Sequence, residues 1–246
     1  LDGLCRTTAD PARLRGSLAQ RADLAAQLGD AASRLAALER AFQLDPHDPS
    51  VRRQLADLAF EAQEWARARD LIEGLLEDRE DLLQRETSIE LHYRLARCAR
   101  ELGDDAGAEK HAAVTLALQP DHRPALLLRA ELDLHDPDLL LADQLALANT
   151  APAEEKGPRF AALGDRYAEL NDPATAREMY REALAHRPDD HLLLTKFLGL
   201  VADDGDWSYS LALVQRLIDT EQDSKVRARY RHLAAMIARD ELERPE

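Results

Sequence analysis

The stretch of sequence that decides the fold is "RFAALGDRYAELNDPATAREMYREALAHRPDD", Arg159–Asp190. Apolar residues recur at helical spacing on both sides of Asn171-Asp172-Pro173, a combination that ends one helix and starts another. Gly164 and Ala176 lie on opposite sides of that turn, and small residues there allow two helices to approach closely. Pro188 closes the segment, because proline cannot continue a helix. The stretch therefore predicts a helical hairpin.

The same hairpin pattern recurs along the chain. The turn appears as "QLGDAAS" from Gln27 and "ELGDDAG" from Glu101, and the closing segment appears as "LDPHD" and "LQPDH". Pro120 and Pro188 lie 68 residues apart, so the spacing predicts a period of about 34 residues. Counting by that period predicts repeats at 15–48, 49–82, 89–122, 123–156, 157–190 and 191–224, followed by a partial repeat at 225–246.

Two positions of the predicted repeat hold small residues in five of its six copies. The eighth position holds Ala22, Ala56, Ala96, Ala130 and Gly164, with Leu198 as the exception. The twentieth position holds Ala68, Ala108, Ala142, Ala176 and Ser210, with Arg34 as the exception. Both positions predict close helix packing inside each hairpin.

Composition limits the class of protein. The chain has 246 residues, of which 45% are hydrophobic, 32% charged and 4% aromatic, and it lacks alternating β-branched runs. We therefore expect an all-α protein. Its net charge of −15 disfavours binding to nucleic acid or to an anionic membrane. Cys5 and Cys98 are interpreted as free thiols of a reducing compartment, which favours a cytoplasmic location.

The Arg159–Asp190 stretch resembles the tetratricopeptide repeat family, through Phe160, Leu163-Gly164, Tyr167, Ala176, Tyr180, Ala183 and Pro188. The resemblance extends over nearly the whole chain and is weakest at 123–156, where we expect irregular geometry. It implies a right-handed α-solenoid of about six helix-turn-helix repeats with partial terminal ones, forming a single domain over 1–246. Both ends look incomplete, so we expect a fragment of a longer chain.

The resemblance also implies a concave groove, lined by the first helix of each repeat, that binds a peptide or a partner domain. The predicted groove residues are Arg53, Asp57, Phe60, Tyr93, Arg94, Arg97, Arg100, Leu127, Glu131, Leu134, Ala161, Asp165, Thr195 and Lys196. The arginines beside aromatic rings are candidates to bind a carboxylate or an acidic peptide. In the alternative interpretation they pair with Asp57, Glu90 and Glu101 on a solvated surface. The lysine and asparagine pattern that grips chaperone tails in one subfamily does not occur here.

Motifs of catalysis and of metal binding are missing from the sequence. The chain has no glycine-rich phosphate loop, no G-x-S-x-G, no H-E-x-x-H and no C-x-x-C. His92 and His111 lie in different helices, and neither has a second ligand at metal spacing. The acidic "VADDGDW", Val201–Trp207, is interpreted as helix capping and not as a calcium loop. We expect no enzymatic activity and no cofactor.

Three functions remain open from the sequence. The first is a scaffold or adaptor for a protein or peptide partner. The second is a regulatory or substrate-recruiting module of an enzyme whose catalytic domain lies outside this sequence. The third is self-association through the incomplete ends.

Overall fold

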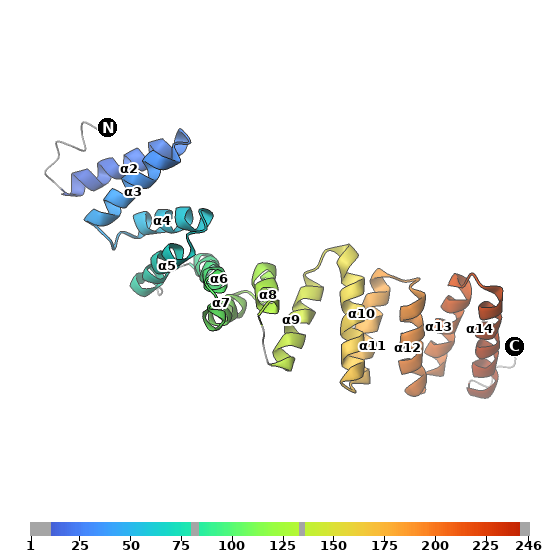
Figure 1. The fold of residues 1–246 in the computed structure, drawn as a ribbon. Helices are drawn as coiled ribbons and strands as arrows, with labels where there is room; N and C mark the ends of the chain where they lie inside the picture. Colours follow the sequence, from blue (N-terminus) through green and yellow to red (C-terminus); the bar gives the residue numbers. More distant parts are fainter. Residues whose placement is uncertain (1–10, 80–83, 133–135, 242–246) are drawn as a thin grey trace. The chain divides into compact units, whose positions relative to one another are not determined.

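The computed structural model describes residues 11–79, 84–132 and 136–241, and these form helices joined by short turns (Figure 1). No strand occurs in these ranges. The helices are α2 (Pro11–Gln27), α3 (Ala31–Leu44), α4 (Pro49–Glu61), α5 (Trp65–Arg79), α6 (Arg85–Glu101), α7 (Asp105–Leu118), α8 (Arg123–Ala130), α9 (Pro137–Asn149), α10 (Ala153–Glu169), α11 (Pro173–His186), α12 (His191–Asp203), α13 (Trp207–Thr220) and α14 (Ser224–Met236), followed by a π-helical turn, η2 (Ile237–Glu241). The expected fold class, an all-α solenoid of helix-turn-helix repeats, is confirmed.

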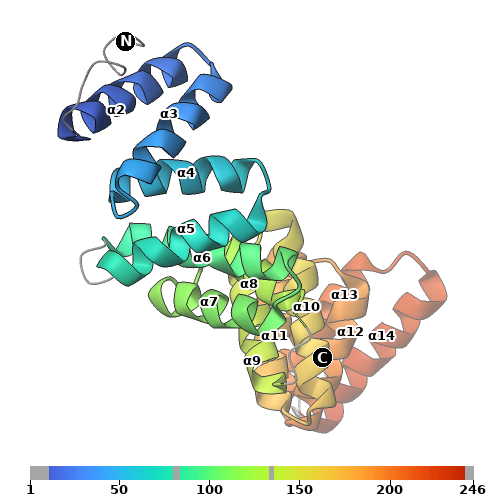
Figure 2. The ribbon, with the colours of Figure 1, turned by 60° about the vertical axis from the view of Figure 1, so that its left-hand side comes forward.

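Contacts divide the chain into two compact units, Leu1–Leu134 (unit 1) and His135–Glu246 (unit 2). Consecutive helices pack as the pairs α2–α3, α4–α5 and α6–α7 in unit 1, and as α10–α11 and α12–α13 in unit 2. Figure 2 shows the unit 1 helices from α2 to α7 following one another as stacked hairpins. The single solenoid predicted over 1–246 stays a prediction.

First helices of the hairpins come in two lengths. α4 and α12 begin at Pro49 and His191, and each has 13 residues. By contrast, α2, α6 and α10 have 17 residues each and begin at Pro11, Arg85 and Ala153. These longer helices start one turn before the predicted repeat boundaries at 15, 89 and 157.

Every one of these five hairpins turns through the same backbone conformation. The second residue after the first helix is left-handed: Gly29, Gly103 and Gly205 have φ of 70°, 75° and 77°, and Gln63 and Asn171 have φ of 59°. The next residue donates its N–H back to the carbonyl five positions earlier, as from Asp104 to Ala99 at 2.8 Å. This hydrogen bond satisfies a carbonyl at the helix end that would otherwise be unpaired. Glycine suits this position because it adopts the left-handed conformation without a Cβ clash.

Aspartates start most of the helices. Asp104 accepts a hydrogen bond from the N–H of Gly107 at 2.9 Å, and Asp206 of the "VADDGDW" run accepts one from Tyr209 at 3.0 Å. The acidic run is therefore a helix cap, as predicted. At the other end of the hairpins, α3, α7 and α11 each end two residues before Pro46, Pro120 or Pro188.

Small residues lie where hairpin helices meet. Ala22, Ala68, Ala96, Ala108 and Ala176 are fully buried. Gly164 of α10 shows the reason most clearly, because a Cβ at this glycine would come within 2.6 Å of the ring of Tyr180 in α11. The close approach of the two helices therefore requires the absence of a side chain at Gly164.

The predicted small positions fail in the region expected to be irregular. Ala130 and Ala142 are both exposed, so the prediction that they pack inside a hairpin is wrong. α8 has only eight residues and ends at Ala130, while the buried residues of α9 include Leu141 and Leu147. Because α8 stops at the predicted packing position, Ala130 is its exposed last residue and not part of a continuing helix face. Leu134, a predicted groove residue, lies outside the described residues.

Each unit has its own apolar core. The largest fully buried side chains include Leu38, Leu55, Ile72 and Leu95 in unit 1, and Leu194, Phe197, Leu213 and Leu217 in unit 2. Cys98 is buried in unit 1 as a free thiol, as predicted, and burial raises its pKa to about 11. Cys5 lies outside the described residues.

Candidate partner-binding surface

A pocket opens between α6 and α8 in unit 1. Its volume is about 340 Å³. The lining consists of Tyr93, Arg97, Arg100 and Glu101 from α6 and of Arg123, Pro124, Leu127, Leu128 and Glu131 from α8 and its end. We call it the α6–α8 pocket. Five of the predicted groove residues of the two repeats meet in it: Tyr93, Arg97, Arg100, Leu127 and Glu131.

Helical spacing places the α6 side chains in the pocket. Tyr93, Arg97 and Arg100 are four and three residues apart, so they share one face of the helix. The opposite face packs in the core through residues such as Leu91 and Leu95, which fixes the rotation of α6. α8 is joined to this face by its cap, because the His122 ring lies 5.0 Å from the Tyr93 ring and its Nδ1 accepts a hydrogen bond from Ala125.

The pocket arginines already have partners on the protein surface. Arg97 Nε donates to Glu101 at 3.0 Å, and an Arg100 nitrogen donates to Asp105 at 2.9 Å. The side chains of Arg97 and Arg100 are 47% and 37% exposed. Ion pairs this exposed are weak, about 0 to 1 kcal/mol, because water screens them. An incoming carboxylate can therefore replace these partners at small cost.

Arg94 occupies a different place from its neighbours on α6. It forms ion pairs with Asp57 of α4 and, through Nε at 2.6 Å, with Glu90 of its own helix. Its guanidinium also lies over the Phe60 ring, 5.3 Å from the centroid, and Phe60 in turn contacts Trp65. Burial opposes the charge of Arg94, but the hydrogen bonds that Arg94 donates to Asp57 and Glu90 outweigh it and raise the pKa of Arg94.

The Arg94 cluster therefore joins α4 to α6 and leaves little of Arg94 for a ligand. The ion pairs of Arg94 and Arg97 with Asp57, Glu90 and Glu101 are those of the alternative sequence interpretation. Arg53, another predicted groove residue, is exposed on α4, and no ion pair of Arg53 occurs within the described residues.

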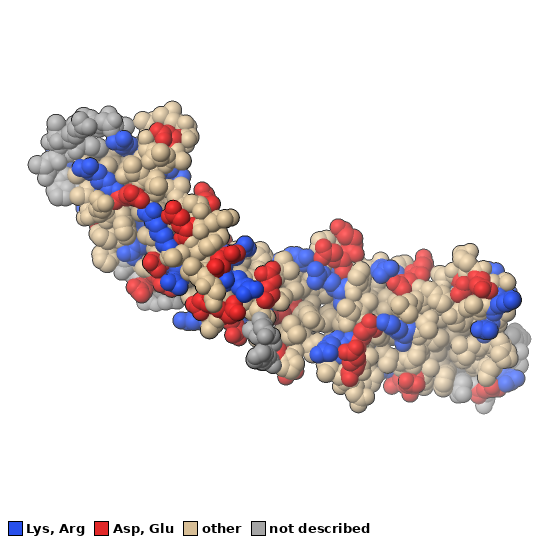
Figure 3. Space-filling view, viewed as in Figure 1, with Lys and Arg blue, Asp and Glu red and all other residues tan. Residues whose placement is uncertain are grey.

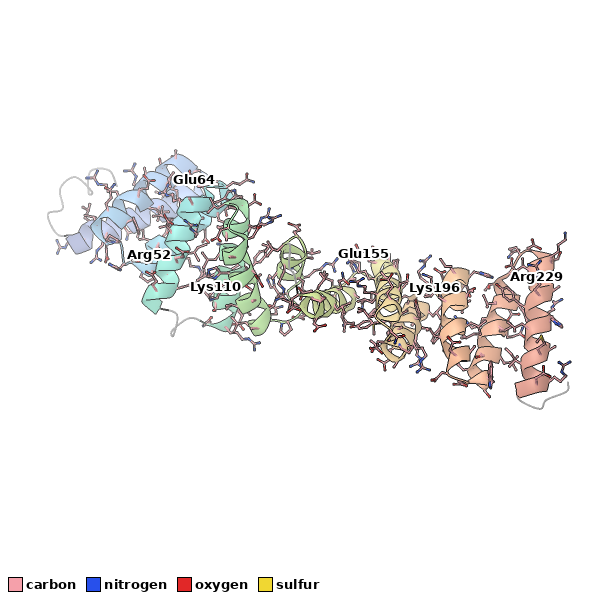
Figure 4. All side chains as sticks on the ribbon, turned by 60° about the horizontal axis from the view of Figure 1, so that its bottom comes forward. Arg52, Glu64, Lys110, Glu155, Lys196 and Arg229 are labelled. Carbon is pink, nitrogen blue, oxygen red and sulfur yellow. The ribbon has the colours of Figure 1, made fainter. Side chains whose placement is uncertain are left out.

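Predicted groove residues of unit 2 are also engaged. Asp165 of α10 accepts a hydrogen bond from the Tyr180 hydroxyl at 2.6 Å and binds Lys196 of α12, which Figure 4 labels, through both oxygens at 2.7 Å. Burial acts against ionisation of Asp165, but the hydrogen bonds from Lys196 and Tyr180 prevail and lower its pKa. Ala161 is half-buried against the unit 2 core, and Thr195 donates to the His191 carbonyl. This set joins three successive helices.

The structure brings together two histidines that the sequence interpretation kept apart. Nδ1 of His92 in α6 lies 3.1 Å from Nδ1 of His111 in α7, and the rings stack. Burial, together with the neighbouring His92, lowers the pKa of His111 to about 4. The sequence signal that could have predicted this contact is the position of the two histidines in the two helices of one predicted hairpin. Throughout the described ranges, no group of three or more His, Cys, Asp or Glu side chains is placed to hold a metal ion.

The arrangement defines a protein built of repeated helical hairpins. The tetratricopeptide repeat profile matches residues 24–85, which span α3, α4 and α5. Hairpins with the same left-handed turn, the same hydrogen bond and the same buried small residues continue outside that match. The chain therefore has a tetratricopeptide-like fold, in which residues 24–85 match the family model itself. Proteins with this fold generally mediate protein–protein interactions and are typically non-catalytic.

Solved structures that are similar to this chain have low sequence identity to it. YrrB, described as a tetratricopeptide-repeat protein with an unusual peptide-binding site, is 19% identical with a TM-score of 0.47, over 71% of this chain and 87% of that one. A tetratricopeptide repeat protein from Parabacteroides merdae is 16% identical with a TM-score of 0.46, over 94% and 89%. The TPR2AB domain of yeast Sti1, from its complex with pHSP90, is 12% identical with a TM-score of 0.44, over 93% and 100%. No curated protein sequence matches significantly.

None of the described helices combines the length and the apolar composition needed to cross a membrane. Figure 3 shows acidic and basic side chains interspersed over the visible face of each unit.

Proposed function

We propose that this chain is a protein-interaction scaffold or adaptor, and that its α6–α8 pocket holds a carboxylate of a partner peptide. The observation that carries the proposal is the meeting of Arg97 and Arg100 with Tyr93 and Leu127 around one pocket. Guanidinium groups bind carboxylates through paired hydrogen bonds, and this geometry favours arginine for such recognition.

The apolar part of the pocket favours a peptide that has an apolar side chain next to its carboxylate. Leu127 is 40% exposed, and Pro124 and Leu128 line the same hollow. An apolar side chain of the peptide, next to its carboxylate, would cover this surface and remove it from water. The proposed ligand is therefore the C-terminus or an acidic residue of a peptide, preceded by a leucine-like side chain.

Binding of short labelled peptides tests the proposal. The probe is a fluorescein peptide ending in Leu-Asp with a free C-terminus, and fluorescence anisotropy reports its affinity for the full chain. We expect Arg97→Glu with Arg100→Glu to weaken binding by about tenfold or more, since two attractive contacts become repulsive. The same peptide with a C-terminal amide and Asn in place of Asp should also bind weakly.

A matched variant controls for net charge. Arg40→Glu with Lys110→Glu changes the charge of the chain by the same amount at two exposed positions of unit 1 outside the pocket. Binding equal to that of the unaltered chain is expected from this control. If both double variants lose affinity alike, or if the amide peptide binds as well as the acid, the pocket assignment is wrong. The enzyme-module alternative and self-association stay predictions.

A further inference from the structure

The last α-helix presents a face whose composition differs from the rest of the chain. Lys225, Arg229, His232 and Met236 follow one another at spacings of four, three and four residues, so they lie along one side of α14. All four are exposed. The other side packs on unit 2, where Tyr230, Leu233 and Ala234 meet the cluster of Val214 and Ile218 from α13. The exposed residues Lys225, Arg229, His232 and Met236 are called the α14 face below.

Charge is segregated on this helix. Ser224–Met236 contains Lys225, Arg227, Arg229 and Arg231 and no acidic residue, although the whole chain carries a net charge of −15. None of these four cations takes part in an ion pair with any described residue. Elsewhere in unit 2, arginines such as Arg159 and Arg177 are paired with carboxylates. Figure 4 labels Arg229 on this helix.

Like charges on adjacent turns repel one another. Lys225 and Arg229 are four residues apart, a spacing that costs a few tenths of a kcal/mol when both carry the same charge. An anionic ligand reverses that cost, because each of its carboxylates would be attracted by two cations. Cations that form no ion pair within the described ranges also have no such pair to lose there when the ligand binds, unlike Arg97 and Arg100 of the α6–α8 pocket.

The basic surface is short and is bounded by acid. Glu221 and Asp223 precede α14, and Asp240 and Glu241 follow it in η2. At about 1.5 Å per residue, the 13 residues of α14 span roughly 20 Å. A long polyanion such as nucleic acid would extend past the helix and meet these carboxylates. Met236, which is 42% exposed, adds an apolar contact that a flexible methionine offers to a protein side chain.

We propose that the α14 face binds a short acidic polypeptide segment of a partner protein. Carboxylates of the segment pair with Lys225 and Arg229, and an apolar side chain packs on Met236. This site is separate from the α6–α8 pocket and does not depend on the function proposed for that pocket.

A peptide of defined composition tests the α14 face. The probe is a fluorescein peptide of about 12 residues that repeats Glu-Glu-Leu, long enough to follow the helix, with its C-terminus amidated. Fluorescence anisotropy with the full chain measures its affinity. The expected result is binding that falls by about tenfold or more in Lys225→Glu with Arg229→Glu and in the peptide that has Gln in place of Glu. Lys225 lies in the first turn of α14, where a glutamate suits the helix dipole, and Arg229 is exposed, so this variant should fold.

Two controls decide between outcomes. Lys156→Glu with Arg181→Glu makes the same charge change in unit 2 away from α14, and we expect it to bind the peptide within about twofold of the original chain. Because the probe also contains Leu-Glu, which the α6–α8 pocket would hold, the measurement is repeated in a chain that carries Arg97→Glu with Arg100→Glu, where the loss from Lys225→Glu with Arg229→Glu should persist. Equal loss in the Lys156 and Arg181 control, no binding by the original chain, or tighter binding of a single-stranded DNA of similar length would each overturn the proposal.

Discussion

The two units build the same hairpin from different side chains. In unit 2 the core contains the buried aromatic residues Phe160, Tyr180 and Phe197, at 4%, 3% and 0% exposure. In the described part of unit 1, the buried hydrophobic side chains are aliphatic or cysteine, and polar His92 and Arg52 are buried among them. One fold therefore tolerates two ways of filling the space between helices, provided that the small positions and the turns are kept.

These differences have physical consequences. Large aromatic rings require space, so unit 2 depends on close approach at positions such as Gly164. Buried polar groups require hydrogen-bond partners, so unit 1 depends on contacts such as that of Arg52 with the Pro46 carbonyl at 2.6 Å. We therefore expect unit 1 to be sensitive to protonation and unit 2 to be sensitive to added volume.

Each unit carries its own fluorescent reporter. The chain has two tryptophans, of which Trp65 lies in unit 1 and Trp207 in unit 2. Trp207→Phe and Trp65→Phe variants consequently allow unfolding of each unit to be followed separately.

The largest expected effect is the response of unit 1 to acid. The pKa of His111 is about 4 in the folded state against 6.5 in the unfolded chain, so the unfolded state binds more protons between these values. The contribution of His111 to the free energy of unfolding of unit 1 is therefore fully present above about pH 6.5. It is lost as the pH drops toward 4, which lowers the free energy of unfolding by about 2 kcal/mol after allowance for partial solvent access. Urea unfolding followed by Trp65 at several pH values measures this loss.

A histidine replacement separates this effect from general acid unfolding. His111→Leu removes the titrating ring, so the fall between pH 6.5 and 4 should largely disappear. The carboxylates of Asp30 and Asp172 also stabilise the folded chain, but this stabilisation is lost at a lower pH. Their pKa values lie below the ordinary value of 3.8, so they become protonated only below that pH. An unchanged pH profile in His111→Leu, or an equal fall reported by Trp207, would show that the histidine pair is not the cause.

The next largest effect is the change in the free energy of unfolding when two glycines of unit 2 are replaced by alanine. Gly164→Ala brings a Cβ against the Tyr180 ring and should lower the free energy of unfolding by about 1 to 2 kcal/mol, because overpacking outweighs the better helix propensity of alanine. Gly199→Ala in α12 meets open space and should raise it by about 0.5 to 1 kcal/mol. Urea unfolding followed by Trp207 measures both, and equal signs for the two variants would contradict the packing argument.

The smallest effect concerns the turn of the second hairpin. Gln63 has φ of 59°, a conformation that costs energy for a residue with a Cβ. Gln63→Gly should raise the free energy of unfolding of unit 1 by about 0.5 kcal/mol, since Gly29 and Gly103 already hold the same position in neighbouring hairpins. Gln63→Val is the opposite control and should destabilise the unit, as followed by Trp65.

Much of the fold could be predicted from the sequence because its causes are local. A glycine after a helix, an aspartate before the next one and a proline after that act within a few residues, and they recur at a fixed period. The periodic small residues then indicate which faces pack together. The same reasoning failed at Ala130 and Ala142, because the early end of α8 is not visible in the spacing of small residues.

Which polar side chains meet was decided by tertiary structure. The sequence placed Tyr93, Arg94, Arg97 and Arg100 on one helix as equivalent candidates, since spacing along a helix shows only that they are near each other. Contacts with two different helices separate them: Arg94 pairs with Asp57 of α4, while Arg97 and Arg100 line the pocket with α8. The contact of His92 with His111 has the same origin, because hydrogen bonds between helices depend on distances that no local pattern encodes.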